Sequence, residues 1–251
     1  LSISPSTQSI AVGRQASYQL ALTPSGGFNR DVPLTIQPQT AGIAATFVPA
    51  DISPQQEATL TLLPDSSVVP GTSAFEVIAS VDTFRQSVDC TLEVFAVPIF
   101  PISDETEYLS DSVFQIDVQL GDANRPVTNL RSVELWLNYT QKDVLAPVIS
   151  DAQRPAAGAL LGANPSFQFT SQPENGRLKL VAESALVDGV SGFGTIAHIP
   201  FTSPLETPDN TTVLFTIDSV VAVDSDGQPL YLSPQNHAIT LREKISFDVL
   251  I

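Results

Sequence analysis

The sequence of 251 residues is poor in several residue types, and each shortage narrows the chemistry that the chain can support. It contains one cysteine and no methionine. A single cysteine allows no disulfide within the chain and no zinc site built from several thiolates. Since translation starts with methionine, we expect a processed mature chain or a fragment, from which an N-terminal signal could have been removed.

Basic residues are also scarce. There are 11 Lys+Arg against 27 Asp+Glu, which gives a formal net charge of −16 and a pI of about 4.2. A field of this sign repels phosphate backbones, so we expect no nucleic-acid partner. No run approaches the roughly 18 apolar residues of a membrane span. Hydrophobic residues make up 43 %, which predicts a folded core rather than disorder.

Short runs of alternating apolar and polar residues dominate the chain, and turn-forming residues separate them. This pattern predicts an all-β sandwich or barrel. In the N-terminal part the alternation predicts these core-facing residues: Ala16, Tyr18, Leu20, Leu22, Phe75, Val77, Ala79, Val81, Val88, Cys90, Leu92 and Val94. Because Cys90 has aliphatic neighbours on this face, we interpret it as a small buried hydrophobe rather than a reactive thiol.

Two prolines near the middle of the chain predict a domain boundary. Pro98 and Pro101 are expected to interrupt a strand and to stiffen an interdomain connection. We therefore predict two domains, residues 1–97 and 98–251. The second has 19 acidic and 8 basic residues, so −11 of the −16 charge lies there. This excess predicts a basic partner surface and salt-dependent binding.

Short stretches of the first domain form a characteristic series: residues 3–6, 12–18, 26–28, 45–49, 59–62 and 70–72. In this order and spacing they resemble a bacterial immunoglobulin-like domain of the kind found in tandem in secreted and surface proteins. The resemblance implies a β-sandwich of seven strands or a similar number. It also implies a structural spacer or an adhesive unit. No residue pattern in this domain indicates catalytic chemistry.

In the second domain the alternating runs predict another set of core-facing residues: Phe114, Ile116, Val118, Leu120, Val133, Leu135, Leu137, Tyr139, Ala197, Ile199 and Phe201. Four stretches of this domain form a second series: residues 135–145, 178–184, 194–201 and 219–227. In this order they resemble a cohesin module, the receptor half of cohesin–dockerin pairs. The resemblance implies a nine-stranded jelly-roll β-sandwich that binds a dockerin-type protein and is not an enzyme. It also implies no cofactor of its own, since calcium in such complexes belongs to the dockerin.

The resemblance places partner binding on one sheet face. The residues that we assign to this face are Ser132, Glu134, Trp136, Asn138, Lys179 and Glu183. Cohesins of the best-known class have Asn and Asp where this chain has Ser132 and Glu134, and their aromatic contact falls near Gln172, so partner specificity is expected to differ. Trp136 is interpreted as an exposed interface anchor. The alternatives are that a loop or the first domain covers Trp136, or that the alternation slips by one residue.

Other interpretations stay open. A carbohydrate-binding or adhesive surface module is the alternative function, although one Trp and four Tyr leave few aromatic side chains to stack on a flat polysaccharide.

His198 and His237 lack the sequence spacing of metal ligands and are interpreted as surface histidines. The Asp224–Gly227 segment begins like a calcium loop, but Gln235 stands where the bidentate Glu belongs, so a turn is favoured.

The whole sequence therefore predicts a piece of an exported scaffold protein, extracellular or attached to the cell surface. An immunoglobulin-like spacer would be followed by a cohesin-like module with a dockerin-type partner. Residues 242–251 could form a last strand or begin another module.

Overall fold

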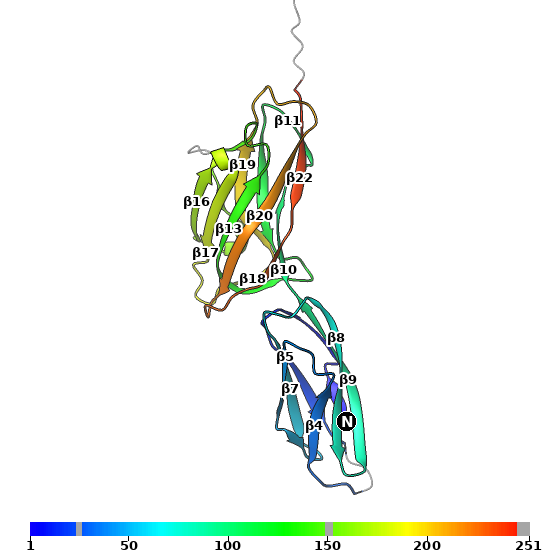
Figure 1. Ribbon diagram of the computed structural model, residues 1–251. Coiled ribbons are helices and arrows are strands. Elements are labelled where there is room, and N and C mark those ends of the chain that lie inside the picture. The colour runs from blue at the N-terminus through cyan, green and yellow to red at the C-terminus, as the bar shows by residue number, and fades with distance from the viewer. Residues whose placement is uncertain (24–26, 149–152, 245–251) are drawn as a thin grey trace, which may run out of the picture. The chain divides into compact units, whose positions relative to one another are not determined.

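The computed structural model describes residues 1–23, 27–148 and 153–244. The chain divides into two compact units, Leu1–Ala96 and Val97–Ile251 (Figure 1). The boundary expected after residue 97 differs by one residue. The last residues of the chain, 245–251, lie outside the described ranges, and so does Gly26 of the immunoglobulin-like stretch 26–28.

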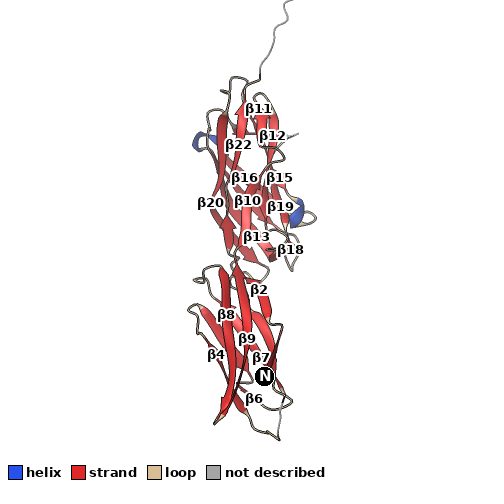
Figure 2. Ribbon diagram, turned by 90° about the vertical axis from the view of Figure 1, so that its right-hand side faces the viewer, coloured by secondary structure: helices blue, strands red, loops and turns tan. Residues whose placement is uncertain are grey.

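Both units are built from strands, which confirms the all-β class (Figure 2). The helical segments of the described ranges are two 3-10 helices of three residues, η1 (Ala159–Leu161) and η2 (Pro173–Asn175). Within these ranges, no helix has the length and apolar character needed to cross a membrane.

Unit 1 is a sandwich of two sheets. Its described strands are β1 (Ser2–Ser4), β2 (Thr7–Ala11), β3 (Ala16–Ala21), β4 (Val32–Gln37), β5 (Ile43–Val48), β6 (Asp51–Ile52), β7 (Glu57–Pro64), β8 (Gly71–Val81) and β9 (Phe84–Phe95). One sheet has the order β1-β3-β7-β5 and the other β2-β9-β8-β4-β6. The Tyr18 hydroxyl on β3 donates a hydrogen bond to the Thr91 carbonyl oxygen on β9 at 2.8 Å, so the two sheets face each other.

The core of unit 1 lies where the alternation predicts it. The predicted residues that are buried are Ala16, Tyr18, Leu20, Leu22, Phe75, Val77, Ala79, Cys90, Leu92 and Val94. Val81 and Val88 are half-buried instead. Val81 lies beside the turn between β8 and β9, where the strand leaves the core.

The buried Cys90 thiol is expected to react slowly. Burial, with a smaller contribution from Asp89, raises the pKa of Cys90 from 9.0 to about 11. Near pH 8 this rise lowers the thiolate fraction about a hundredfold, and the thiolate is the reactive form. We therefore expect labelling of the native protein by an aromatic disulfide reagent to be at least about a hundredfold slower than labelling of the urea-unfolded protein. Equal rates in the two states would contradict the buried placement.

Unit 2 is a second sandwich. Its described strands are β10 (Val97–Ile102), β11 (Glu107–Leu109), β12 (Val113–Leu120), β13 (Val127–Tyr139), β14 (Ala146–Pro147), β15 (Ala156–Ala157), β16 (Ser166–Gln172), β17 (Arg177–Glu183), β18 (Val190–Gly192), β19 (Gly194–Thr202), β20 (Thr211–Asp224), β21 (Leu232–Pro234) and β22 (His237–Arg242). The six-stranded sheet has the order β14-β19-β12-β10-β21, with β15 also paired to β19. The seven-stranded sheet has the order β11-β22-β20-β13-β17-β16, with β18 also paired to β13. The described part of unit 2 thus has thirteen strands where nine were expected, and five of them span only two or three residues.

An aromatic cluster joins the two sheets of unit 2. It consists of Phe114 and Phe201 from the six-stranded sheet and Tyr139 and Phe215 from the seven-stranded sheet. The Phe201 ring lies 5.2 Å from the rings of both Tyr139 and Phe215, in edge-to-face geometry. Because Phe201 contacts all three other rings, it is the centre of this core.

Pro98 and Pro101 lie in β10 rather than in a linker, so the predicted interdomain connection at this point is wrong. β10 pairs with β12 on one side and with the short β21 on the other. The carbonyl of Pro98 accepts a hydrogen bond from the Gly121 N–H at 2.7 Å, and this bond needs no N–H from the proline. β21 pairs only with residues 97–99 of β10. The Pro101 nitrogen points towards the side of β10 on which β21 lies, but β21 does not extend as far as Pro101, so no hydrogen bond is lost there. The strand therefore tolerates both prolines.

Candidate functional site

All residues that the sequence singled out for partner binding lie on the outward side of the seven-stranded sheet, over β13 and β17. We call the outward side of β16, β17, β13 and β20 the candidate face (Figure 1). Its predicted members are Ser132, Glu134, Trp136, Asn138, Lys179 and Glu183. The antiparallel register puts Trp136 opposite Lys179 and Ser132 opposite Glu183. The structure thus brings the six together, and their role in binding stays a prediction.

The face points outward because side chains alternate along β13. The core-facing members of this strand are the ones that the sequence predicts: Val133, Leu135, Leu137 and Tyr139. Of the outward members, Glu134 is exposed, whereas Ser132, Trp136 and Asn138 are half-buried.

Three ion pairs cross the candidate face, each between side chains on different strands: Lys179–Glu134 at 2.7 Å, Arg131–Glu183 at 2.9 Å and Arg177–Asp218 at 2.7 Å. Exposed pairs of this kind contribute only about 0–1 kcal/mol each, so their main effect is to order the side chains. Acids and bases balance in these pairs. The negative excess of unit 2 therefore lies elsewhere, and the paired groups do not by themselves favour the basic partner surface that the overall charge had predicted.

Trp136 lies among these pairs and is partly covered. The guanidinium of Arg177 stacks over its ring, with Cζ 4.6 Å from the ring centroid. Nε of Arg177 also donates a hydrogen bond to Asn138 Oδ1 at 3.0 Å, and Nη2 contacts Asp218. Trp136 therefore points outward, as the alternation predicts, but Arg177 shields part of the indole that the sequence had indicated as exposed.

Gly176 positions Arg177 at the start of β17. Its N–H donates to the Pro173 carbonyl oxygen at 3.0 Å, and its carbonyl accepts from the Tyr139 N–H at 2.8 Å. Gly176 has a φ of +63°, and a Cβ at this position would lie 2.4 Å from the Tyr139 carbonyl oxygen. Only glycine fits this turn, which sets the Arg177 side chain beside Trp136.

Three charged members of the face were not among the predicted residues: Arg131, Arg177 and Asp218. Arg177 could have been found, because it lies two residues before Lys179 and alternation puts both on the same side. Asp218 lies at a register shift in the pairing of β13 with β20, and Arg131 lies at another. Such bulges displace one residue without a reliable sequence signal, so these two were not predictable.

Apolar side chains and a recess complete the candidate face. Val221 is 66 % exposed, and it lies opposite Glu134 from β20, as Val181 does from β17. A recess of about 260 Å³ is lined in part by Arg177 and Asp218. Exposed apolar groups with charged pairs around them are typical of protein–protein interfaces.

The Asp224–Gly227 segment forms a turn, held by the carboxylate of its first residue. Asp224 Oδ1 accepts hydrogen bonds from the N–H groups of Asp226 at 3.0 Å and Gln228 at 2.7 Å. The Gly227 N–H donates to the Asp224 carbonyl oxygen at 3.0 Å. The carboxylate that would begin a calcium loop is thus bonded to its own backbone. The described ranges contain no group of three or more His, Cys, Asp or Glu side chains placed to hold a metal ion.

The two histidines are both half-buried, and each makes a polar contact with a neighbouring strand or loop. His198 Nδ1 lies 2.8 Å from Asp117 Oδ1. His237 Nε2 lies 2.7 Å from Ser103 Oγ, and burial lowers the pKa of His237. They lie in different sheets, on β19 and β22, and have different partners.

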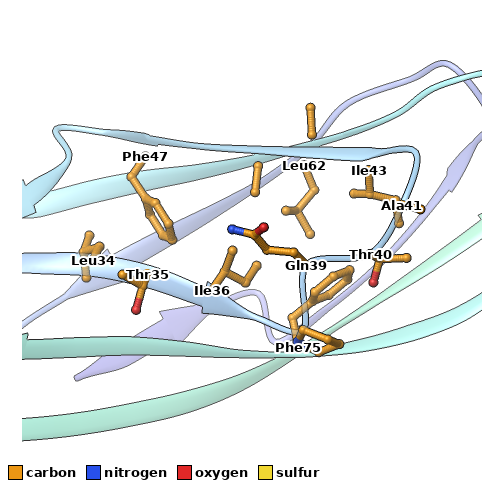
Figure 3. Close-up of a pocket in the computed structure, with 13 residues that line it drawn as sticks. Leu34, Thr35, Ile36, Gln39, Thr40, Ala41, Ile43, Phe47, Leu62 and Phe75 are labelled. Carbon is orange, nitrogen blue, oxygen red and sulfur yellow. The ribbon is translucent and has the colours of Figure 1, made fainter.

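Unit 1 has a pocket of about 650 Å³ between β4 and β5 (Figure 3). Phe47, Leu62 and Phe75 lie around it, and the Gln39 amide is its most central polar group in this view. The described residues that line the pocket are all uncharged.

Comparisons with known proteins find similarity in structure only. No family model matches the sequence, and no curated protein matches it either. A type I cohesin–dockerin complex from Clostridium thermocellum gives a TM-score of 0.50 at 11 % identity, covering 60 % of this chain and 96 % of that one. A type II cohesin domain from the cellulosome of Acetivibrio cellulolyticus gives 0.48 at 18 % identity, with 58 % and 95 % covered. A non-cellulosomal cohesin from the archaeon Archaeoglobus fulgidus gives 0.46 at 19 % identity, with 59 % and 91 % covered.

At such identities the likeness shows the fold alone. The first of these comparisons shows that the chain contains a β-sandwich of the cohesin fold, and unit 2 makes up a similar share of the chain. The immunoglobulin-like character of residues 1–97 stays a prediction.

Proposed function

We propose that unit 2 is a non-catalytic receptor module that binds a dockerin-type protein through the candidate face. The observation that carries this proposal is the arrangement around Trp136. A large aromatic side chain lies on an outward sheet face, partly under Arg177 and among three ion pairs. The fold supports the proposal, because the similar structure from Clostridium thermocellum is a cohesin in complex with a dockerin.

The face indicates what such a partner has to offer. An apolar side chain would pack against Trp136 and Val221 and bury their surface. Polar groups of the partner would meet the rim, where Glu134 and Glu183 already have cationic partners. Any calcium would be bound by the dockerin. In this proposal unit 1 is an immunoglobulin-like spacer, and the chain belongs to a scaffold outside the cell.

Binding can be tested with the full chain against purified type I and type II dockerin modules. We expect at least one to bind with micromolar or tighter affinity in a surface-bound assay. Glu134→Gln removes a rim charge and its pair with Lys179, so it should weaken binding by about three- to tenfold and reduce the salt dependence of association. Affinities at low and physiological salt check this.

The matched control is Glu206→Gln, which neutralises an exposed glutamate outside the candidate face. It should leave the affinity unchanged. If no dockerin binds the wild-type chain, the proposed partner class is wrong. If Glu134→Gln and Glu206→Gln behave alike, the binding surface lies elsewhere.

A further inference from the structure

The other sheet of unit 2 carries a groove that the proposed function does not use. It has a volume of about 640 Å³. Its lining residues come from β11, β12, β15 and β19, from the loop between β10 and β11, and from the segment before β15. The polar and aromatic members that matter here are Asp104, Tyr108, Gln115, Arg154 and His198. Gln115 and His198 point outward from the six-stranded sheet, since their strand neighbours Phe114, Ile116, Ala197 and Ile199 are buried.

A hydrogen-bond network holds two planar side chains on this sheet. Asp117 Oδ1 accepts from Gln115 Nε2 at 2.6 Å and lies 2.8 Å from His198 Nδ1. Gln115 Nε2 also lies 3.1 Å from His198 Nδ1, so the three side chains hold one another in place. Gln115 Oε1 and His198 Nε2 are the polar atoms of these two side chains that Asp117 does not engage. Side chains that are already oriented lose less conformational entropy when a ligand binds.

An aromatic side chain is fixed at the same groove. The Tyr108 ring stacks on Phe114 with a centroid distance of 4.4 Å. Its hydroxyl donates to Asp104 Oδ1 and accepts from the Glu105 N–H at 3.1 Å. Burial, with the bond to Asp104, raises the pKa of Tyr108, and the same bond lowers the pKa of Asp104. Near neutral pH the phenol is therefore protonated and the carboxylate ionised.

Arg154 extends the polar surface beyond this groove. It is exposed and lines both the groove and a second hollow of about 550 Å³. Phe167 and Phe169 on β16 line that second hollow. The two hollows share Arg154 and Ala156, so together they could accept a ligand longer than one ring.

The lining offers donors, acceptors and aromatic rings in one place, and the positive Arg154 balances the negative Asp104. Such a set suits a neutral ligand with many hydroxyl groups, each of which both donates and accepts. We propose that this groove binds a neutral saccharide chain, independently of the candidate face.

Affinity electrophoresis of the full chain tests the proposal, in native gels that contain soluble β-glucan, xylan, galactomannan or polygalacturonate. We expect retardation by at least one of the three neutral polysaccharides. Gln115→Ala and Arg154→Ala should each weaken that retardation about tenfold, since each removes a hydrogen-bonding group. Both side chains are exposed, and unfolding followed by Trp136 fluorescence checks that the variants fold.

The control is Glu134→Gln on the candidate face, which should leave saccharide binding unchanged. Loss of dockerin binding with intact retardation would count against the proposed function alone. No retardation in any gel, or retardation by polygalacturonate only, overturns the saccharide proposal. So does equal retardation of wild type, Gln115→Ala and Arg154→Ala.

Discussion

Replacing Trp136 by alanine is expected to weaken binding of a dockerin partner about a hundredfold, since buried tryptophans at the centre of an interface contribute about 2–4 kcal/mol. The rest of the face should keep its arrangement, because Arg177 remains bonded to Asn138 and Asp218 when the indole is removed. Trp136→Phe keeps an aromatic ring under Arg177 and should retain part of the affinity. Titration calorimetry against the dockerin that binds the wild-type chain measures both changes.

Phe193→Ala is the matched control for Trp136→Ala. Phe193 is also an aromatic residue of unit 2, 51 % exposed, but it lies outside the candidate face, between β18 and β19. Its loss should leave partner affinity unchanged. If the partner affinity of Trp136→Ala lies within twofold of the wild-type value, and the variant has the same urea midpoint of unfolding, then Trp136 is not the interface anchor.

Replacing Phe201 by alanine is expected to destabilise unit 2 by about 3–5 kcal/mol, the usual cost of truncating a buried aromatic side chain. Phe201 is fully buried and contacts Phe114, Tyr139 and Phe215, so its removal leaves a cavity between the two sheets. Phe201→Leu fills much of this space and should cost less. The loss of stability should appear as a lower midpoint of the urea unfolding transition.

The chain contains one tryptophan and one cysteine, and they report on different units. Trp136 fluorescence follows unfolding of unit 2, and labelling of Cys90 follows opening of unit 1. In Phe201→Ala the fluorescence transition should shift, whereas the labelling of Cys90 should stay as in wild type. A shift in the fluorescence transition of less than about 1 kcal/mol would show that the aromatic cluster is not central to the core of unit 2.

Much of the fold was predictable because strand alternation is a local property. Along β13 the core-facing residues were assigned correctly from the sequence, and so were Phe114, Ile199 and Phe201 in the opposite sheet. Because side chains alternate between the two faces of a strand, only two assignments of core-facing residues are possible. The one that buries the apolar side chains is strongly favoured. The outward position of Trp136 and Glu134 followed from the same rule.

Proline was the least reliable local signal. Pro98 and Pro101 indicated a linker, yet both lie in β10. Whether a proline ends a strand depends on whether its missing N–H would have faced a partner strand. For Pro101 that depends on the length and position of β21, which lies more than a hundred residues later in the sequence.

By itself, the sequence determined the all-β class, many of the core residues of both units and which side chains of β13 point outward, because these follow from alternation within single strands. Only the tertiary structure decided which outward side chains contact one another. It placed Arg177 over Trp136, introduced Asp218 through a bulge and paired Glu134 with Lys179. It also joined Gln115, Asp117 and His198 from two strands. These contacts depend on register between distant segments, which no local pattern specifies.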